Sequence, residues 1–441
     1  MTDPGNLKIL EFDKIISKLE SFAHTSKGRS KCLELVPSSD LLEVSAMIKE
    51  TDDSLKVIIS RSVPPIYGFE DISSPVARSQ TGASLSCSEL LDIAKFLRGV
   101  SRLISFAGKP DEEQDNILYA SIRRLISVPS LENKITSAVA DEEELHDNAS
   151  AQLALIRKRI RDAQNEVKIQ LEKMLKTYKD SLQEQIITMR GSRYVIPVRT
   201  DHRNDIKGII HDTSSSGATL FVEPLSIVEI NNKVRELMSE ERDEIDRILA
   251  ELSGYVSGYA SELHGDLEIV TYIDFITAKG RLALSMDAMC PLLNDRGIIQ
   301  MKNARHPLIP KDRVVPVTIR IGEAYKTLVI TGPNTGGKTV TLKTCGLLTL
   351  MTMSGLMIPV SDNSHVSIFK NISADIGDEQ SIEQSLSTFS SHMSKLVRMV
   401  SEAMPETLML VDELGSGTDP SEGAALAVSI LEHFKDRKSV V

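Results

Sequence analysis

The sequence predicts a multidomain fold. A mostly α core or lever carries an antiparallel coiled-coil clamp with a small β tip, and an α/β domain follows. Three observations predict this fold. The chain has 441 residues, which is more than one hydrophobic core usually serves. Aromatic residues make up only 4% and Trp is absent, which favours helices packed by aliphatic side chains. From about residue 301 the pattern changes from helical periodicity to short β-like runs.

The periodicity divides the chain into four predicted parts. Residues 1–145 read as a helical core or lever, because apolar positions recur at helical spacing between loop signals. Residues 146–265 form the coiled-coil clamp, and residues 266–300 return to the helical core. Residues 301–441 form the α/β domain. Within the clamp, three β-like runs predict the tip between the two long helices: Tyr194–Val198, Gly208–His211 and Ala218–Val222.

Composition limits the cellular setting. The N-terminus lacks a basic segment followed by an apolar one, and no stretch approaches the roughly 18 apolar residues of a membrane span. We therefore expect a cytoplasmic protein with no membrane partner. The four cysteines have no C-x-x-C spacing, so neither a zinc site nor a disulfide framework is predicted. The net charge of -11 argues against a broadly basic surface that coats DNA, although local basic patches remain compatible with it.

A glycine-rich loop lies between an apolar run and a helical segment. The apolar run Lys326–Thr331 predicts a buried strand, and a helical pattern begins after the loop. The loop matches G-x-x-x-x-G-K-[ST] and comprises Gly332, Pro333, Asn334, Thr335, Gly336, Gly337, Lys338 and Thr339. Backbone N–H groups of such a loop bind phosphates, the lysine reaches the β and γ phosphates, and the hydroxyl ligates Mg²⁺. ATP and Mg are the predicted cofactors, with Lys338 also a candidate catalytic residue.

A second apolar run, Thr407–Val411, ends in two acidic residues. Asp412 is the predicted Mg ligand together with Thr339, and Glu413 is the predicted catalytic residue that polarises the attacking water. An apolar strand that ends in Asp-Glu is often only structural, but a phosphate-binding loop upstream favours the catalytic interpretation. The α/β domain is therefore predicted to be an ABC-type P-loop ATPase domain.

Three further features of this domain leave alternatives open. Ser387 begins a helical pattern whose N-terminus binds a phosphate or is an ordinary N-cap. Asp378 and Gln380 lie near Mg and water or belong to a surface loop. The turn Gly415–Asp419 contacts a neighbouring subunit or simply connects a strand to a helix.

Basic residues gather near the predicted tip and on the first long helix. The candidates for contact with nucleic acid are Arg193, Arg199, Arg203 and Lys207, and a second group on the helix is Arg157, Lys158, Arg159 and Arg161. Such clusters neutralise phosphates. The alternative is a solvated face, because coiled-coil surfaces are often charged for solubility alone.

Several segments together resemble the MutS family: TGPNTGGKT, the Ser387-Thr388-Phe389 segment, LVDELGSGTDPSEGAALA and Arg305-His306-Pro307. Two others, ADIGDEQSIEQSLSTFSSH and SSSGATLFVEP, fit its second bacterial branch, MutS-two, which includes endonuclease and ribosome-rescue types. The resemblance covers the chain from its first helices to its end. It implies a homodimer in which ATP lies between the loop 332–339 of one subunit and Ser387 of the other.

The resemblance implies an ATP-dependent nucleic-acid clamp. Its targets would be branched DNA, where it suppresses recombination, or stalled and collided ribosomes, which it rescues. The alternative is a non-catalytic ribosome-binding or scaffolding module that uses ATP only to dimerise. A third class, the chromosome-maintenance ATPases with long arms, places its coiled coil between the two nucleotide motifs, whereas here the coiled coil precedes both.

The chain departs from the family pattern at several points. The repair branch has a mismatch-reading wedge near its N-terminus, whereas here the tripeptide Phe221-Val222-Glu223 lies at the tip. The family's downstream histidine switch, the end of the ATPase fold and the C-terminal nuclease domain have no counterpart, so we expect a truncated chain. Residues 436–441 abandon the apolar pattern before them, which suggests that they are not native.

Overall fold

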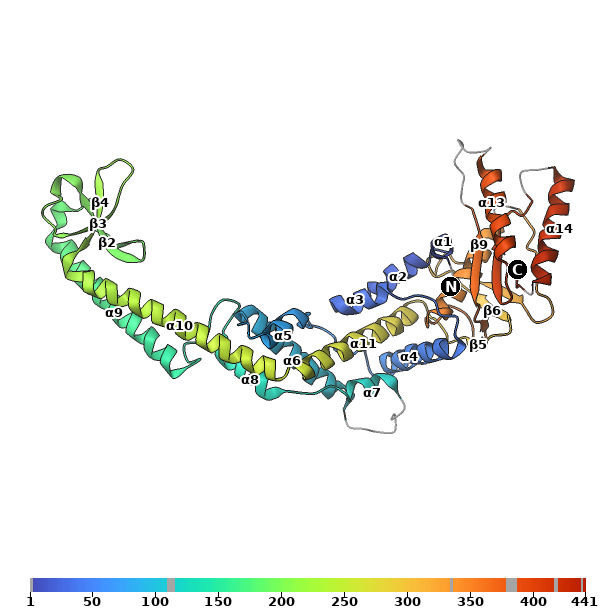
Figure 1. The fold of residues 1–441 in the computed structure, drawn as a ribbon, viewed down its shortest axis with the longest axis horizontal. Coiled ribbons are helices and arrows are strands. Elements are labelled where there is room, and N and C mark those ends of the chain that lie inside the picture. The colour runs from blue at the N-terminus through green and yellow to red at the C-terminus, as the bar shows by residue number, and fades with distance from the viewer. Residues whose placement is uncertain (1–2, 109–115, 334–335, 378–386, 416–418, 438) are drawn as a thin grey trace. The chain divides into compact units, whose positions relative to one another are not determined.

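The computed structural model describes residues 3–108, 116–333, 336–377, 387–415, 419–437 and 439–441 (Figure 1). The structure is mostly helical with three small sheets among these residues. It divides into two compact units, each discontinuous in sequence. The first comprises Met1–Asp71, Gly99–Ser127 and Gly265–Val441, and the second comprises Ile72–Arg98 and Val128–His264. The predicted division into four parts stays a prediction.

The second unit contains a pair of long helices and the tip sheet. Its helices are α5 (Ser73–Gln80), α8 (Pro129–Ala138), α9 (Ala151–Thr177) and α10 (Val228–Gly258), with 3-10 turns at Lys179–Ser181, Thr200–His202 and Leu225–Ile227. Its strands are β1 (Thr188–Arg190), β2 (Arg193–Arg199), β3 (Gly208–Thr213) and β4 (Thr219–Pro224). Two further helices, α6 (Cys87–Ala107) and α11 (Ala260–Ser285), begin in this unit and end in the first.

Helices α9 and α10 pack along each other in opposite directions (Figure 1). Ser150 caps α9 by accepting a hydrogen bond from the Leu153 N–H, and its hydroxyl donates to Glu244 of α10 at 2.6 Å. At the other end of α9, Met174 accepts a weak hydrogen bond from Ser226. One apolar face of each helix is buried in the seam, by Ile156, Ile160, Ala163, Val234 and Leu237.

The tip is an antiparallel sheet in the order β1-β2-β4-β3, and the three predicted β runs are confirmed as β2, β3 and β4. Ile196 of β2 pairs with Val222 of β4, so their side chains share a face. That face packs on Val167 and Leu171 of α9. The tip is therefore built on the end of the helix pair by alternating apolar positions.

The first unit contains the remaining elements. Its helices are α1 (Pro4–Ile9), α2 (Phe12–Glu20), α3 (Ser26–Leu33), α4 (Leu41–Ser60), α7 (Ile117–Ile122), α12 (Lys338–Met353), α13 (Ser387–Glu402) and α14 (Pro420–Asp436). Its strands are β5 (Leu292–Asn294), β6 (Ile299–Ala304), β7 (Val317–Ile321), β8 (His365–Ser367), β9 (Asn371–Asp375) and β10 (Thr407–Val411). They form one sheet in the order β5-β8-β6-β7 and a parallel pair of β9 and β10.

Strand β10 is covered on both faces. Met409 lies in one apolar cluster with Leu396 of α13 and Phe434 of α14. The next residue, Leu410, reaches Gly346 of α12, because successive side chains of a strand point to opposite faces. The predicted strand at Thr407–Val411 is confirmed. Because this strand is buried, it holds the start of the acidic pair that follows it in a fixed place.

The predicted buried strand over Lys326–Thr331 is wrong. The structure forms no strand there, and the side chain of Val329 is 65% exposed. Among the described residues, the backbone of this segment forms two hydrogen bonds, at Lys326 and Leu328, both with Val441. Val440 in turn bonds β10 at Thr407 and Met409. Residues 439–441 thus lie between the segment and β10, which leaves the segment without a continuous strand partner.

Candidate nucleotide site

The acidic pair follows the carboxyl end of the parallel strands β9 and β10. Val411 is in register with Asp375, and the Asp412 N–H donates to the Asp375 carbonyl at 2.9 Å. Ligand-binding residues of α/β sheets typically follow the carboxyl ends of parallel strands. The backbone of Asp412 is therefore held by β9, a strand that the sequence analysis did not predict. The alternation of Ile372, Ala374 and Ile376 was the signal that would have revealed it.

The glycine-rich loop leads directly into α12. Gly337 has φ +78° and forms the N-cap, a left-handed conformation that glycine adopts without steric cost. Lys338 is the first residue of the helix, and its ammonium group donates to the Gly332 carbonyl at 2.7 Å. The helix predicted after the loop is confirmed. Asn334 and Thr335 lie outside the described residues.

The two predicted Mg ligands meet. The Thr339 hydroxyl donates to the Asp412 carboxylate at 2.5 Å, so the start of α12 and the end of β10 converge on one point. Oxygen donors of this kind suit Mg²⁺, which usually takes one or two protein oxygens and completes its shell with phosphate oxygens and water. Within the described ranges, no cluster of three His, Cys, Asp or Glu side chains offers an alternative metal site.

Glu413 is exposed and has an unusual backbone conformation. Its φ is +52°, which is uncommon for a residue with a side chain, and its N–H donates to the Asp412 carboxylate at 3.1 Å. Gly415 then turns the chain with φ +84°, and a Cβ there would lie 2.4 Å from the Gly423 carbonyl. Gly415 thus lies close against the backbone of α14, two residues after Glu413.

A cavity of about 420 Å³ connects these motifs. Its lining includes Gly332, Lys338, Asp412 and Glu413, together with apolar side chains of β10 and α14. Apolar walls with a few convergent polar groups are typical of ligand sites. The glycine-rich loop and the acidic pair therefore line the same cavity. In the sequence, Lys338 and Asp412 are 74 residues apart.

Other predicted residues fall outside this description. Helix α13 begins at Ser387 as predicted, but the side chain of Ser387 lies outside the described part of the chain. Asp378, Gln380 and residues 416–418 of the turn also lie outside it. Their predicted roles stay predictions.

The four tip residues predicted to contact nucleic acid differ in their surroundings. Arg193 donates to the fully buried Glu223 at 2.7 Å and to Asn232 at 2.7 Å. Hydrogen bonds from Asn231, His211 and Arg193 outweigh the burial of Glu223 and keep the pKa of its carboxyl below its usual range. Arg193 therefore holds the tip together as well as being a candidate contact.

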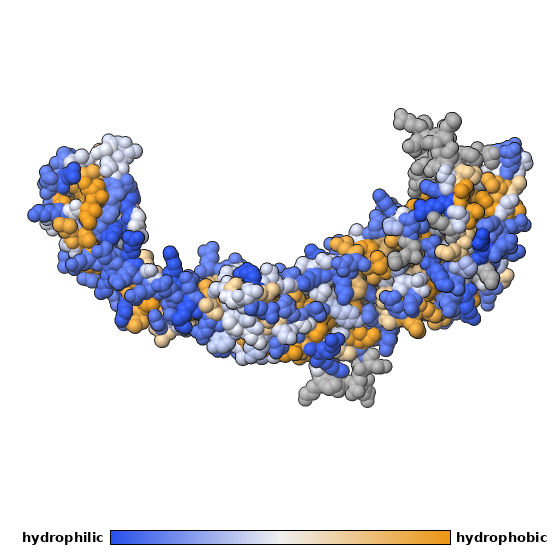
Figure 2. Space-filling model, viewed as in Figure 1, coloured by the Kyte–Doolittle hydropathy of each residue, from blue (hydrophilic) through white to orange (hydrophobic). Residues whose placement is uncertain are grey.

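The other three candidates are more accessible. Arg199 forms an exposed ion pair with Asp201 at 3.0 Å, while Arg203 and Lys207 are exposed. Their binding of nucleic acid stays a prediction. Figure 2 shows apolar as well as hydrophilic surface at the tip, where Ile209 and Met189 are exposed. The tip surface is therefore mixed rather than uniformly basic.

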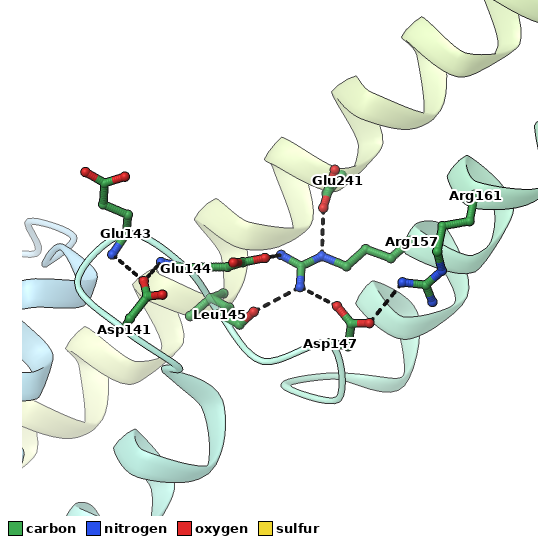
Figure 3. Close-up of polar contacts among 8 residues, drawn as sticks. All are labelled: Asp141, Glu143, Glu144, Leu145, Asp147, Arg157, Arg161 and Glu241. Atoms are coloured by element: carbon green, nitrogen blue, oxygen red, sulfur yellow. Dashed lines mark hydrogen bonds and ion pairs between the residues drawn. The ribbon is translucent and has the colours of Figure 1, made fainter. Parts of the chain in front are cut away.

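Two of the four basic residues on α9, Arg157 and Arg161, form ion pairs. Figure 3 shows the Arg157 guanidinium between Glu241 of α10, Asp147 and the Leu145 carbonyl. Asp147 also accepts from Arg161 at 3.0 Å, and these arginine hydrogen bonds lower the pKa of its carboxyl. Arg157 is thus committed to joining α9, α10 and the segment before α9.

Comparison with known proteins assigns the part of the chain that contains these residues to a known domain family. Residues 328–441 match the family model for MutS domain V, a range that contains Lys338, Thr339, Asp412 and Glu413. Over 437 residues the chain is 49% identical to a protein of Acetivibrio thermocellus named endonuclease MutS2. The chain belongs to the MutS family, in its MutS2 branch.

Two further MutS2 proteins show the extent of the match. Endonuclease MutS2 of Ruminiclostridium cellulolyticum is 47% identical and that of Clostridium botulinum is 44% identical. The alignments cover 98%, 96% and 98% of this chain, but only 55%, 54% and 55% of the three relatives. The chain thus spans about half the length of the curated relatives it matches. In the described part of the chain, no helix combines the length and apolar character needed to cross a bilayer.

Proposed function

We propose that the chain is an ATPase that binds ATP with Mg between the loop 332–339 and the acidic pair. The observation that carries the proposal is the contact between Thr339 and Asp412, because it joins the two motifs at the point where a phosphate-bound cation would lie. The loop N–H groups and Lys338 would bind the β and γ phosphates. Thr339 and Asp412 would hold Mg²⁺, which supplies positive charge to those phosphates when it is bound.

Glu413 has the role of orienting and polarising the attacking water. Its position directly after the Mg ligand supports this role, and its exposure toward the cavity at Lys338 leaves it accessible to water. Ser387, from a second copy of the chain, would contact the γ phosphate. The protein would then act as a homodimer with a nucleotide between its two copies.

We further propose that nucleotide state controls a clamp on nucleic acid. The helix pair α9–α10 with its tip would contact branched DNA or a ribosome through Arg199, Arg203 and Lys207, with Arg193 supporting the tip. The exposed cations and the length of the helix pair support this use. ATP binding would shift an equilibrium between arrangements of the clamp.

The test uses a longer MutS2 protein with the equivalent of Glu413→Gln, which is expected to bind ATP without hydrolysing it. Co-sedimentation with ribosomes and retardation of branched DNA are measured at the same salt concentration, because phosphate contacts are salt-dependent. Binding to ribosomes alone indicates translation rescue, and binding to branched DNA alone indicates suppression of recombination. Binding to neither overturns the clamp and leaves the ATPase proposal.

The second candidate is a non-catalytic ribosome-binding or scaffolding module that uses ATP only to dimerise. Among the described residues, no side chain forms a hydrogen bond or ion pair with the Glu413 carboxylate, and this observation favours keeping the alternative. Single-turnover hydrolysis separates the two. A chain that dimerises with ATP but leaves it intact is the module, whereas release of phosphate that depends on Glu413 identifies the ATPase.

A further inference from the structure

The side chain of Asn6 on α1 caps the free edge of β9. Its amide group donates to the Ile372 carbonyl at 3.0 Å, and its oxygen accepts from the Ala374 N–H at 3.2 Å. The Asp375 carbonyl, one residue further, points the other way and accepts from Asp412. Backbone groups of a strand alternate in this manner, so Asn6 satisfies β9 on the side opposite β10. A single side chain thus takes the place of a neighbouring strand.

The residue that follows α1 contacts the helix of the glycine-rich loop. Leu10 is fully buried, and a Cβ added to Gly346 of α12 would lie 2.7 Å from Leu10 and 2.5 Å from Leu410 of β10. Leu10 and Leu410 therefore converge on the same position of α12, with no room for a larger side chain. The helix that begins at Lys338 rests on the N-terminal segment as well as on β10.

The N-terminal segment also contacts α13. Asp3 accepts a hydrogen bond from Arg398 at 3.1 Å, and Lys395, one turn earlier on the same helix, lies 3.8 Å from the Asp375 carboxylate. These pairs link the helix that begins at Ser387 both to the start of α1 and to the end of β9. The Arg398–Asp3 pair is exposed and weak by itself, so the partly buried hydrogen bonds of Asn6 and the buried side chain of Leu10 carry most of the attachment at the start of α1.

We propose that residues 3–10 position the Mg-binding end of β10 and couple it to α2, the helix that follows α1. Asn6 is the positioning residue: it holds β9, the Asp375 carbonyl of β9 holds the Asp412 backbone, and the Asp412 carboxylate meets Thr339. Contacts to α12 and α13 allow the same segment to respond when those helices move. The proposal rests on the proposed binding of ATP with Mg.

The test measures the affinity of the purified chain for a fluorescent ATP analogue with Mg²⁺ and with EDTA. In Asn6→Ala, the ratio of the two affinities is expected to fall about fivefold to tenfold, the size that loss of two partly buried hydrogen bonds allows, because Asp412 is displaced. The affinity in EDTA stays unchanged, since the glycine-rich loop is intact. A merely structural role would lower both affinities together. Lys8→Ala, on an exposed position of the same helix, is the matched control.

Asn6→Asp gives a second variant, because its carboxylate still accepts from the Ala374 N–H but cannot donate to the Ile372 carbonyl. A fall in the ratio of the affinities with Mg²⁺ and with EDTA that is smaller than the fall in Asn6→Ala supports the proposal. Hydrogen–deuterium exchange of the unaltered chain gives a test that needs no variant. Mg with the ATP analogue should slow exchange in residues 3–10 as well as in residues 371–375.

The outcomes separate this inference from the proposed function. If the unaltered chain shows no Mg-dependent gain in affinity, the proposed nucleotide site is wrong. If the gain is present but is the same in Asn6→Ala, or if residues 3–10 exchange equally fast with and without Mg and the analogue, the positioning role is overturned.

Discussion

At the residue scale, Lys338 and Glu413 line one cavity but have separable roles. Lys338 would contact the phosphates in the bound ground state, so its loss should weaken binding itself. Glu413 would act only on the attacking water, so its loss should leave binding intact. Substitution of Lys338 should therefore change the affinity for ATP, whereas substitution of Glu413 should change the rate of hydrolysis.

We expect Lys338→Ala to weaken ATP binding about tenfold or more, the cost of one charge-assisted phosphate contact. Glu413→Gln should bind ATP within about twofold of the unaltered chain but hydrolyse it about a hundredfold more slowly, the lower range for loss of a general base. Equilibrium binding and phosphate release measure the two effects. Equal loss of binding in both variants contradicts the assigned roles.

Arginines of the tip also differ at this scale, because Arg193 is bound to the buried Glu223 whereas Arg203 is exposed. Arg193→Ala leaves a buried carboxylate without its cation and should lower the free energy of unfolding by about 3 kcal/mol. Arg203→Ala should change it by less than about 0.5 kcal/mol. Urea unfolding followed by circular dichroism measures both.

The same two variants test the nucleic-acid surface. Arg203→Ala should reduce the slope of log affinity against log salt concentration by about 1 if Arg203 contacts a phosphate. Lys207→Ala should behave in the same way. An unchanged slope in both variants removes the tip from the proposed contact surface.

At the element scale, the start of α9 is joined to α10 by Ser150 and Glu244. Glu244 is buried, and hydrogen bonds from Arg247 and Ser150 lower the pKa of its carboxyl to about 2 from an ordinary value of 4.5. A carboxyl group whose pKa is lower in the folded state than in the unfolded state stabilises the fold at pH values above its unfolded-state pKa. That contribution is lost as the pH falls from about 5 towards 2.

We expect the helix pair to lose about 1 kcal/mol of stability from Glu244 over this pH range, a value reduced for solvent because Arg247 is 54% exposed. Thermal unfolding at pH 7 and pH 3 measures the loss. Glu244→Gln should show a smaller difference between the two pH values. Glu251→Gln, an exposed partner of the same arginine, is the control and should retain the difference of the unaltered chain.

At the scale of the whole molecule, the dimer proposal assigns each nucleotide to residues of two copies. The loop 332–339 would come from one copy and Ser387 from the other, and a twofold assembly then has two equivalent sites. Neither Lys338→Ala nor Ser387→Ala should hydrolyse ATP alone. A mixed dimer, however, contains one site with both residues intact.

We therefore expect equal mixing of Lys338→Ala and Ser387→Ala to restore about a quarter of the unaltered rate, since about half of randomly formed dimers are mixed and each has one working site. ATP hydrolysis by the mixture, compared with each variant alone, is the measurement. Sedimentation should show that the mixture contains dimers. Dimers without recovered hydrolysis mean that Ser387 acts on the nucleotide of its own copy, whereas normal hydrolysis by Ser387→Ala alone means that Ser387 does not act.

The sequence by itself determined the features that depend on neighbouring residues along the chain. The long helix α9 follows from apolar spacing and an N-cap serine, the strands of the tip follow from alternation, and α12 and β10 follow from the patterns around the glycine-rich loop and the acidic pair. Local motifs were sufficient to name Lys338, Thr339, Asp412 and Glu413 as the candidate site. The motifs in which they occur predict the role of each side chain without knowledge of the fold.

Only the tertiary structure decided which partners those residues have. Periodicity cannot show that Arg193 is bound to a buried Glu223, that Lys326–Thr331 lacks a strand partner, or that Asn6 lies on β9. Asn6 and Ile372 are 366 positions apart, and hydrogen bonding between them depends on how distant segments pack. The physical reason is that hydrophobic spacing and caps act within a few residues, whereas charge pairing, edge capping and the meeting of Thr339 with Asp412 require the folded chain.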